Sequence, residues 1–568
     1  MQHSGKYLAW RALALVMLLL LGCGGGSSPG GGNVNTPPPS GGNPNPPPPT
    51  GGNPSPPPPT PGPPPIASVL TYHNDNARDG LNAQETILTQ ANVNSAQFGA
   101  IGFFPVDGLV DAQPLFLPSQ TIGGKSHNVL YVATEHDSVY AFDADSGAVL
   151  WQVSLLGAGE TTSDDRGCDQ VTPEIGVTST PVIDPNAGPH GTIFVVAMSM
   201  NGSGTYFQRL HALDVSTGAE LGSSPVTVQA RYPGTGDNSS SGFVVFDPAQ
   251  YKERPGLLLL NGVVYTFWSS HCDDAPYTGW IIGYSESTLA KSRVFNIIPN
   301  GSEGSIWASG AGPAADGSGN IYFMSANGTF DTTLNAQGFP NQGDYGNAFV
   351  KLSTAGGNLS VTDYFTMSGT VDESNADEDL GSGGTLLLPA MQDSGGTTRH
   401  LAVGAGKDQT IYVVDRDNMG KFDPSTDHIW QEIPNGLGGS EFAMPAYFNG
   451  TVYYGSVGDV IRAFSVSNAM LSTTPTSMSA HNFGYPGATP SISANGTNNG
   501  IVWVAENGSP AGLYAYDAGN LGHELYDSNQ AGTRDQFGPG NKFITPTIAN
   551  GRVYVGTTNG VQVFGLLH

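Results

Sequence analysis

The stretch NVLYVATEHDSVYAFDADSGAVLW, residues 128–151, is the clearest indication of the fold class. It contains three short apolar runs rich in Val, Leu and Tyr, and polar residues with Gly separate these runs. Short apolar runs bounded by such residues are typical of strands rather than helices. Residues 128–151 therefore predict three strands joined by tight turns.

The same unit recurs along most of the chain. Each copy has a first strand that contains proline, a turn, a Tyr-rich second strand, a loop and a third strand that ends near Asp. Residues 444–464 (MPAYFNGTVYYGSVGDVIRAF) and 545–564 (TPTIANGRVYVGTTNGVQVF) are two clear copies. Asn-Gly between apolar strands is a strong hairpin signal. Because one such unit cannot bury both of its faces, radial stacking in a β-propeller is predicted.

The prolines of the first strands give the expected number of blades. Strand Ile101–Val106 is expected to close the ring by pairing near Val561–Phe564, which removes exposed sheet edges. Pro255 and Pro389 belong to degenerate copies, so seven or nine blades remain alternatives. We expect an all-β fold, an eight-bladed β-propeller over residues 112–568. The prolines counted are Pro114, Pro181, Pro255, Pro313, Pro389, Pro445, Pro490 and Pro546.

The composition fits this fold and excludes one class of partner. Glycine occurs 79 times and only 12% of residues are charged, which is typical of many short strands joined by tight turns. The formal charge is −27, and the 20 Lys and Arg residues form no cluster. Nucleic-acid binding requires basic patches for the phosphates, so it is not expected.

The first 23 residues predict export. Two basic residues precede the apolar run Ala12–Leu21, which is too short to span a bilayer and is typical of a secretion signal. Leu20-Leu21-Gly22-Cys23 resembles a bacterial lipobox, which implies cleavage before Cys23 and lipidation of its thiol. An ordinary signal peptide is the alternative. Because Gly24 is not the aspartate that retains lipoproteins in an inner membrane, an outer-membrane or cell-surface position is expected.

The segment after the signal predicts a tether. Residues 24–65 are almost all Gly, Pro, Ser, Asn and Thr, with four consecutive prolines at 46–49 and again at 56–59. Such a composition cannot bury a core, so we expect a disordered Pro- and Gly-rich linker of partly polyproline character. Residues 66–111 are expected to form an N-terminal strap and the strand that closes the ring.

The repeats resemble a known family. The pattern AFDADSG (residues 141–147) followed by Trp151, and ALDVSTG (residues 212–218), resemble the quinoprotein-type propeller repeat. That family includes alcohol dehydrogenases dependent on pyrroloquinoline quinone (PQQ) and also non-catalytic lipoprotein propellers. The resemblance covers roughly Gln113 to the end. It implies a quinoprotein alcohol dehydrogenase-like fold but leaves the chemistry open, because one fold hosts many functions.

The resemblance extends to individual site positions. Residues 304–331 resemble the dehydrogenase segment in which a Trp lies under the cofactor ring and an Asn binds Ca²⁺, which implies these roles for Trp307 and Asn327. The stretch DEDLGSGG resembles the segment with the catalytic aspartate, which implies Asp379, with Asp377 as a rival. GKDQTIYVVDRDNMG resembles the strand pair whose cation contacts the quinone, which implies Lys407.

Loop positions independently predict that these residues converge. In a propeller, loops entering first strands and loops leaving second strands lie on one face, and Trp307, Asn327, Asp379, Lys407 and Glu174 all occupy such loops. The candidate Ca²⁺ ligands are Asn327, Asp379 and Glu174. The implied chemistry is proton removal by Asp379, stabilisation of negative charge by Lys407, and polarisation of a quinone carbonyl by the cation.

The chain also departs from the dehydrogenases. Their adjacent cysteine pair is missing, their Ca²⁺-binding glutamate has only Asp273 or Asp274 as weak substitutes, and no CxxCH haem motif occurs. The three cysteines are Cys23, Cys168 and Cys272. Once Cys23 is lipidated, only one pair remains in an oxidising compartment, so a Cys168–Cys272 disulfide is predicted.

Two functions compete, and a third stays open. The missing motifs favour an exported, lipid-anchored binding or scaffold module with a vestigial cofactor site, whose partner is a protein or glycan of the bacterial cell envelope. The alternative is a PQQ- and calcium-dependent dehydrogenase of a small alcohol or sugar. Glycan cleavage by paired carboxylates is the third reading, because the predicted face is acidic.

Overall fold

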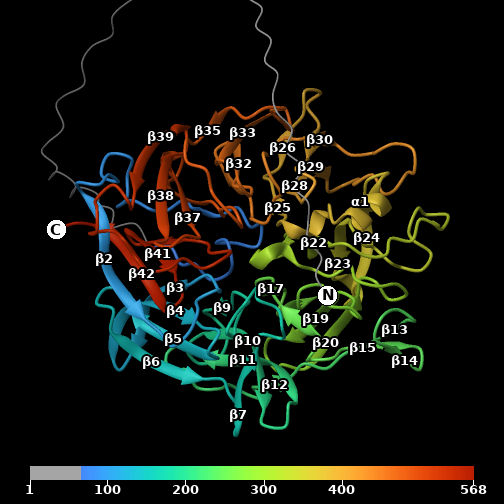
Figure 1. The fold of residues 1–568 in the computed structure, drawn as a ribbon, viewed down its shortest axis with the longest axis horizontal. Helices are drawn as coiled ribbons and strands as arrows, with labels where there is room; N and C mark the ends of the chain where they lie inside the picture. The colour runs from blue at the N-terminus through green and yellow to red at the C-terminus, as the bar shows by residue number, and fades with distance from the viewer. Residues whose placement is uncertain (1–65) are drawn as a thin grey trace, which may run out of the picture. The chain divides into compact units, whose positions relative to one another are not determined.

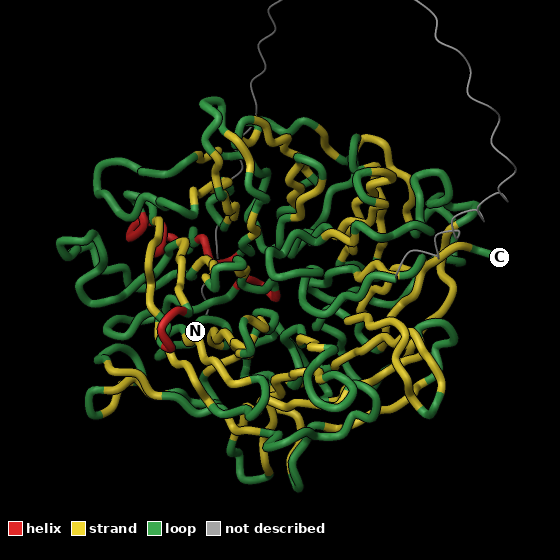
Figure 2. The backbone as a smooth tube through the Cα atoms, turned by 180° about the vertical axis from the view of Figure 1, so that it is seen from behind, coloured by secondary structure: helices red, strands yellow, loops and turns green. Residues whose placement is uncertain are grey.

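The computed structural model describes residues 66–568, and within them the fold is almost entirely β. The only α-helix in this range is α1 (Thr370–Ala376), and the short 3₁₀ turns are η1 (Ala308–Gly310), η2 (Ala355–Gly357) and η3 (Leu380–Ser382) (Figure 2). Among residues 66–568, no helix has the length and apolar character needed to cross a membrane. The predicted signal peptide, Cys23 lipidation and tether lie outside the described residues.

Eight sheets of four or more strands follow one another along residues 66–568, and Figure 1 shows them arranged in chain order around a common axis. The fold class is the predicted β-propeller, whereas the assignment of one blade to each sheet stays a prediction. The first four sheets contain β3 (Leu115–Ile122), β4 (Lys125–Ala133), β5 (Ser138–Asp143) and β6 (Val149–Ser154); β7 (Glu160–Asp164), β8 (Glu174–Ile175), β9 (Val182–Asp184), β10 (Thr192–Asn201), β11 (Tyr206–Asp214) and β12 (Val226–Thr227); β16 (Tyr251–Glu253), β17 (Leu258–Leu260), β18 (Val263–Ser270), β19 (Trp280–Ser285) and β20 (Lys291–Asn296); and β21 (Ala314–Ala315), β22 (Asn320–Met324), β23 (Phe349–Ser353) and β24 (Ser360–Phe365).

The remaining sheets include the two strands of the N-terminal segment, β1 and β2. The last four large sheets contain β25 (Leu386–Leu387), β28 (Leu401–Ala405), β29 (Ile411–Asp415) and β30 (Gln431–Ile433); β31 (Ala446–Phe448), β32 (Thr451–Tyr454), β33 (Arg462–Ser467), β34 (Met470–Leu471) and β35 (Ser477–Met478); β1 (Leu81–Asn82), β36 (Ser491–Asn495), β37 (Asn498–Glu506), β38 (Gly512–Asp517) and β39 (Asn520–Asp527); and β2 (Phe98–Pro105), β40 (Thr547–Ala549), β41 (Arg552–Gly556) and β42 (Gly560–Leu566). Two small sheets pair β13 (Arg231–Pro233) and β14 (Ser239–Ser240) with β15 (Phe243–Val245), and β26 (Met391–Gln392) with β27 (Thr398–Arg399).

A strand of the N-terminal segment and the last strand of the chain meet in one sheet. Strand β2 pairs antiparallel with β42, so that Phe98 lies opposite Leu566 and Pro105 opposite Gly560. In Figure 1 the blue β2 accordingly lies beside the red β42. This pairing closes the ring where the sequence predicts it, and it covers an edge that would otherwise expose unpaired backbone groups.

The repeat motif explains how successive sheets hold each other. Trp151 donates its indole N–H to Val215 O of the next sheet at 3.0 Å, and Tyr131 donates its hydroxyl to the same oxygen at 2.9 Å. Gly218, in the turn after Val215, has a positive φ of 70°, and a Cβ there would lie 2.7 Å from the Trp151 ring. Only glycine allows that approach. The Trp and the Asp-Val-Ser-Thr-Gly turn of the repeats are therefore parts of one contact between sheets.

The strap is hydrogen-bonded to the first strands of several sheets. Arg78 is fully buried and donates to the carbonyl oxygens of Tyr72, Leu257 and Pro313 at 2.7, 3.2 and 3.0 Å. Leu257 and Pro313 lie on inner segments of two different sheets, so one guanidinium joins the strap to both. Because each buried carbonyl needs a donor, Arg78 acts as a shared hydrogen-bonding hub.

Candidate functional site

A cavity of about 380 Å³ lies where loops that precede the first strands of the sheets meet loops that follow the second strands. Its volume is in the range of small-molecule sites. Trp307, Asn327, Asp379 and Lys407, which the sequence placed on one face by two separate arguments, all line it, whereas their chemical roles stay predictions. The complete lining is Gln170, Arg254, Cys272, Asp273, Trp307, Ser309, Ala326, Asn327, Asp377, Asp379, Ser382, Lys407, Phe442, Tyr485 and Phe543.

An ion cluster forms one wall of this pocket. Lys407 Nζ lies 2.9 Å from Asp379 Oδ1 and also pairs with Asp377. The Asp379 side chain is 3% exposed, whereas that of Asp377 is 69% exposed. Gly406 makes the close approach feasible, because a Cβ at this position would lie 2.2 Å from Asp379 O. The two carboxylates that competed for one role in the sequence analysis are therefore held by the same ammonium group.

The ionisation of the cluster follows from its burial. Burial raises the pKa of Asp379, and the charge of Lys407 offsets only part of that effect. Burial also opposes the charge on Lys407, but the carboxylates of Asp379 and Asp377 outweigh it and raise the pKa of the amine. The raised pKa of Asp379 favours a neutral carboxyl group, whereas the raised pKa of Lys407 favours a charged ammonium group. The 2.9 Å contact favours the ionised pair, since it satisfies both charges at once.

Asn327 and Asp377 are held together at the mouth. Asn327 donates from Nδ2 to Asp377 Oδ1 at 2.6 Å, while Asn327 Oδ1 is buried without a hydrogen-bond partner within residues 66–568. Asp377 follows α1 in a left-handed conformation with φ of 60° and donates its backbone N–H to Glu373 O and Ser374 O. The helix end therefore presents the Asp377 carboxylate to Asn327 and Lys407.

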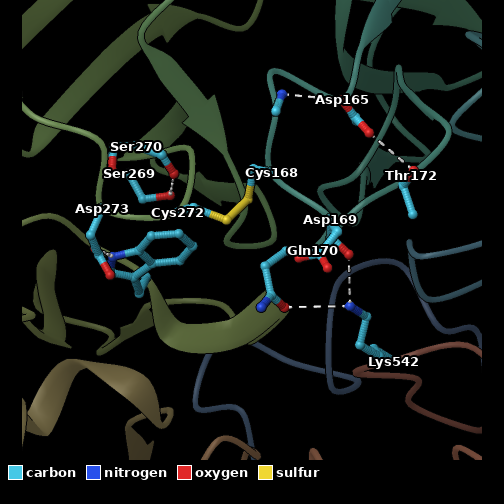
Figure 3. The surroundings of a disulfide bond; sticks show 12 residues. Asp165, Cys168, Asp169, Gln170, Thr172, Ser269, Ser270, Cys272, Asp273 and Lys542 are labelled. Carbon is cyan, nitrogen blue, oxygen red and sulfur yellow. Dashed lines mark hydrogen bonds between the residues drawn. A yellow bond between two sulfur atoms is a disulfide. The ribbon is translucent and has the colours of Figure 1, made fainter. Parts of the chain in front are cut away.

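Asp273, which directly follows a disulfide-bonded cysteine, holds the Trp307 side chain in place. Its indole N–H donates to Asp273 Oδ1 at 3.1 Å, and Tyr277 donates its hydroxyl to the same oxygen at 2.9 Å. Asp273 directly follows Cys272, which is bonded to Cys168 with a Cα–Cα distance of 5.6 Å, and Figure 3 shows these three residues together. The predicted disulfide is thus confirmed, and it forms part of the pocket wall.

Comparison with known proteins agrees with this architecture. A PQQ-repeat family model, described as outer membrane protein assembly factor BamB, matches residues 135–233. Among solved structures, the quinohemoprotein alcohol dehydrogenase from Comamonas testosteroni aligns over 88% of this chain and 80% of its own, with 14% identity and a TM-score of 0.57. The fold of this chain is therefore a β-propeller like that of the quinohemoprotein dehydrogenases, and residues 135–233 match the PQQ repeat.

Two further solved structures share the propeller fold. The quinohemoprotein alcohol dehydrogenase ADHIIG from Pseudomonas putida HK5 is 12% identical, with a TM-score of 0.57, and the alignment covers 88% of this chain and 80% of that one. A europium-containing methanol dehydrogenase is 13% identical, with a TM-score of 0.56 and coverage of 88% and 98%. No curated protein matches in sequence. At these identities the likeness establishes the fold alone.

Glu174, a candidate metal ligand from the sequence, does not line the pocket. Strand β8 pairs with β7, and Glu174 lies opposite Asp164 in that hairpin. Its carboxylate contacts His136 Nδ1 at 3.0 Å and accepts from the Thr162 hydroxyl at 2.7 Å. The hairpin therefore ties Glu174 to the second sheet, apart from Asn327 and Asp379.

The donor set of the pocket does not fit calcium. Within residues 66–568, no three His, Cys, Asp or Glu side chains are grouped so that they could hold a metal ion. The ammonium group of Lys407 contacts both Asp377 and Asp379, and the amide nitrogen of Asn327 points to Asp377. Ca²⁺ takes six to eight oxygen ligands, whereas here Lys407 contacts two of the three pocket carboxylates, and the third, that of Asp273, accepts hydrogen bonds from Trp307 and Tyr277.

A second group of pocket residues was not predicted from the sequence: Arg254, Phe442, Tyr485 and Phe543. Phe442 and Phe543 each lie three residues before a first-strand proline, a spacing that would have placed them on the same face. Arg254 precedes Pro255, which divides the first strand of its sheet into β16 and β17, both paired with β18. Because this copy of the repeat is irregular, its sequence did not predict that Arg254 lines the pocket.

Proposed function

We propose that this PQQ-like repeat propeller is a ligand-binding module of the bacterial cell envelope, and that its pocket binds a planar quinone of the PQQ class. The observation that carries the proposal is the convergence of Trp307, Asn327, Asp379 and Lys407 on one cavity of about 380 Å³. A pocket with a flat aromatic side chain, a few convergent polar groups and shifted pKa values is typical of a small-molecule site.

Each residue supplies a specific part of the recognition. The indole of Trp307 offers an apolar face, and its hydrogen bond to Asp273 fixes the plane of that face. Lys407 provides a positive charge for a quinone oxygen or carboxylate. Asn327 Oδ1, buried without a partner among the described residues, offers an acceptor at the same place. These groups fit a planar ligand with oxygen substituents, and they require no metal ion.

A dehydrogenase is the second candidate, and the environment of Asp379 favours it. A bound quinone would supply a two-electron acceptor. Asp379 is nearly enclosed, and Lys407 is its only charged contact within hydrogen-bond distance among residues 66–568. An alcohol hydroxyl reaching Asp379 would therefore meet a carboxylate with reduced hydration. Such a carboxylate can accept the hydroxyl proton, while Lys407 stabilises the negative charge that develops nearby.

The cell-envelope location is part of the proposal. The lipobox resemblance at Cys23 and the Pro-rich segment 24–65 support a lipid-anchored, tethered protein whose partners are envelope proteins, glycans or small molecules. The Cys168–Cys272 bond gives independent support, because disulfides persist mainly in exported proteins.

Calorimetric titration of PQQ into the purified protein tests the proposal, with EDTA in one series and Ca²⁺ in another. We expect micromolar binding in both series, and we expect its loss in Trp307→Leu. Trp430→Leu is the matched control, because Trp430 is also half-buried but lies outside the pocket. Absence of binding to folded protein would refute the quinone site, and binding only with Ca²⁺ would refute the metal-free site.

A dye-coupled assay separates the two candidates. In the presence of PQQ, small alcohols and sugars are offered to the protein, and reduction of the dye is measured. Substrate-dependent reduction that disappears in Asp379→Asn would establish the dehydrogenase. PQQ binding without reduction by any substrate would leave the binding module as the function.

A further inference from the structure

Arg254 lines the pocket, and its guanidinium has no hydrogen-bond or ion-pair partner among the described residues. The residue is 4% exposed, and its Nη1 atom is fully buried. Among residues 66–568, no carboxylate lies within the 4.0 Å distance of an ion pair with Arg254. Arginine is almost never buried without a partner, because an uncompensated buried charge is strongly unfavourable. An unpaired guanidinium at a pocket wall therefore points to an anionic ligand.

The surroundings of Arg254 are aromatic. Its Cζ lies 4.4 Å from the ring centroid of Phe543 and 5.9 Å from that of Trp307. Tyr485 packs edge-on against Phe543 at 6.2 Å, and Phe442 against Tyr485 at 5.8 Å. Rings cover the flat face of a guanidinium, but its N–H groups lie in the plane and remain available for a carboxylate. Aromatic walls beside such a cation suit an aromatic ligand.

The nearest charges do not neutralise this site. Lys252 is buried nearby, and burial together with Arg254 lowers its pKa to about 7. The acids that face Arg254 are Asp111 and Glu135. Burial and the neighbouring Asp111 raise the pKa of Glu135 well above its usual range, so Glu135 supplies little negative charge. Asp111 accepts a hydrogen bond from Asn541 and forms no ion pair with Arg254 among the described residues.

We infer that Arg254, Tyr485 and Phe543 form a carboxylate subsite, and that the pocket takes an aromatic acid through it. The subsite lies beside Phe442, Tyr485 and Phe543. The Asp377–Asp379–Lys407 cluster is a separate part of the pocket lining. The inference deepens the proposed function and rests on it through the shared pocket, because the same pocket would hold the quinone. An aromatic acid is thus a second ligand or the substrate class.

Three small probes test the chemistry of the subsite in the purified protein. Benzoate carries both a ring and a carboxylate, benzyl alcohol carries only the ring, and acetate carries only the carboxylate. Dissociation constants are measured by ligand-observed NMR. Because a charge-assisted hydrogen bond is about twice as strong as a neutral one, we expect benzoate to bind at least about tenfold more tightly than either of the other probes.

Arg254→Met identifies the residue responsible. We expect this variant to bind benzoate no better than benzyl alcohol, with a melting temperature equal to or above that of the wild type, because it removes an unpaired buried charge. Arg399→Met is the matched control. Arg399 stacks on Trp430 at 4.3 Å but pairs with Asp393 and Asp415, so its loss should lower the melting temperature and leave benzoate binding unchanged.

The outcomes distinguish this inference from the proposed function. No benzoate binding at millimolar concentration, equal binding of benzoate and benzyl alcohol, or benzoate binding retained in Arg254→Met would overturn the subsite. A lower melting temperature in both Arg254→Met and Arg254→Gln would show a structural residue and overturn it as well. PQQ binding without benzoate binding refutes only the inference, and benzoate binding without PQQ binding refutes only the quinone proposal.

Discussion

Removing the Cys168–Cys272 disulfide should destabilise the propeller by several kcal/mol. The bond joins residues 104 positions apart, so reduction releases a loop of roughly a hundred residues in the unfolded chain. The loop-entropy relation gives about 4.7 kcal/mol for a loop of this size. We expect the double variant Cys168→Ala/Cys272→Ala to lose about 3–5 kcal/mol of unfolding free energy, since native-state strain and residual unfolded structure commonly reduce the full value.

Equilibrium urea denaturation, followed in parallel by tryptophan fluorescence and circular dichroism, measures this loss. The bond supplies its own control, because Cys168 and Cys272 are the only cysteines after Cys23. Reductant should shift the wild-type transition to that of the double variant and leave the variant unchanged. Equal unfolding free energies, within about 1 kcal/mol, would refute the loop-entropy reasoning. Labelling of Cys168 or Cys272 in the non-reduced folded protein would refute the bond itself.

Three further perturbations have signs that the structure determines. Arg78→Met should lower the unfolding free energy by at least about 3 kcal/mol in urea denaturation, because it leaves several buried carbonyl groups without donors. Lys407→Met should cost about 3 kcal/mol by stranding the buried Asp379 charge, and the double variant Lys407→Met/Asp379→Asn should recover part of it. Burial raises the pKa of Glu441 from 4.5 to about 8, so its stabilising effect is complete below pH 4.5 and is lost as pH rises to 8. Melting temperatures across this range should therefore depend less on pH in Glu441→Gln than in the wild type.

The fold was predictable because its information is local and repeated. Residues 128–151 specify three of the four strands of one sheet, and the contact of Trp151 with Val215 joins that sheet to the next. The same short apolar runs and Asn-Gly turns recur in later copies, so errors in one degenerate copy do not change the architecture. The strap was harder, because Arg78 acts through carbonyl groups that are distant in sequence and leave no pattern.

The site was predictable only in part, for a geometric reason. Loops of known type place Trp307, Asn327, Asp379 and Lys407 on one face, and the structure brings them to one pocket. The rule does not specify how far each side chain reaches, so Glu174 qualified by position although the β7–β8 hairpin directs it to His136 and Thr162. Arg254 has no regular copy around it, and only the packing of Phe543 against its guanidinium reveals it.

The charges around the pocket explain why Lys407 contacts Asp379, to which the resemblance assigned a Ca²⁺ ion. Asp377 and Asp379 supply two carboxylates, and a single ammonium group contacts both of them. Bringing in Ca²⁺ would require displacing Lys407 or burying a third positive charge beside it, and Arg254 already places an unpaired cation in the same cavity. Among the described residues, Arg254 is therefore the pocket cation that has no carboxylate partner. An anionic ligand can pair with Arg254 directly, whereas a metal ion cannot, so ligand binding through Arg254 should be insensitive to EDTA.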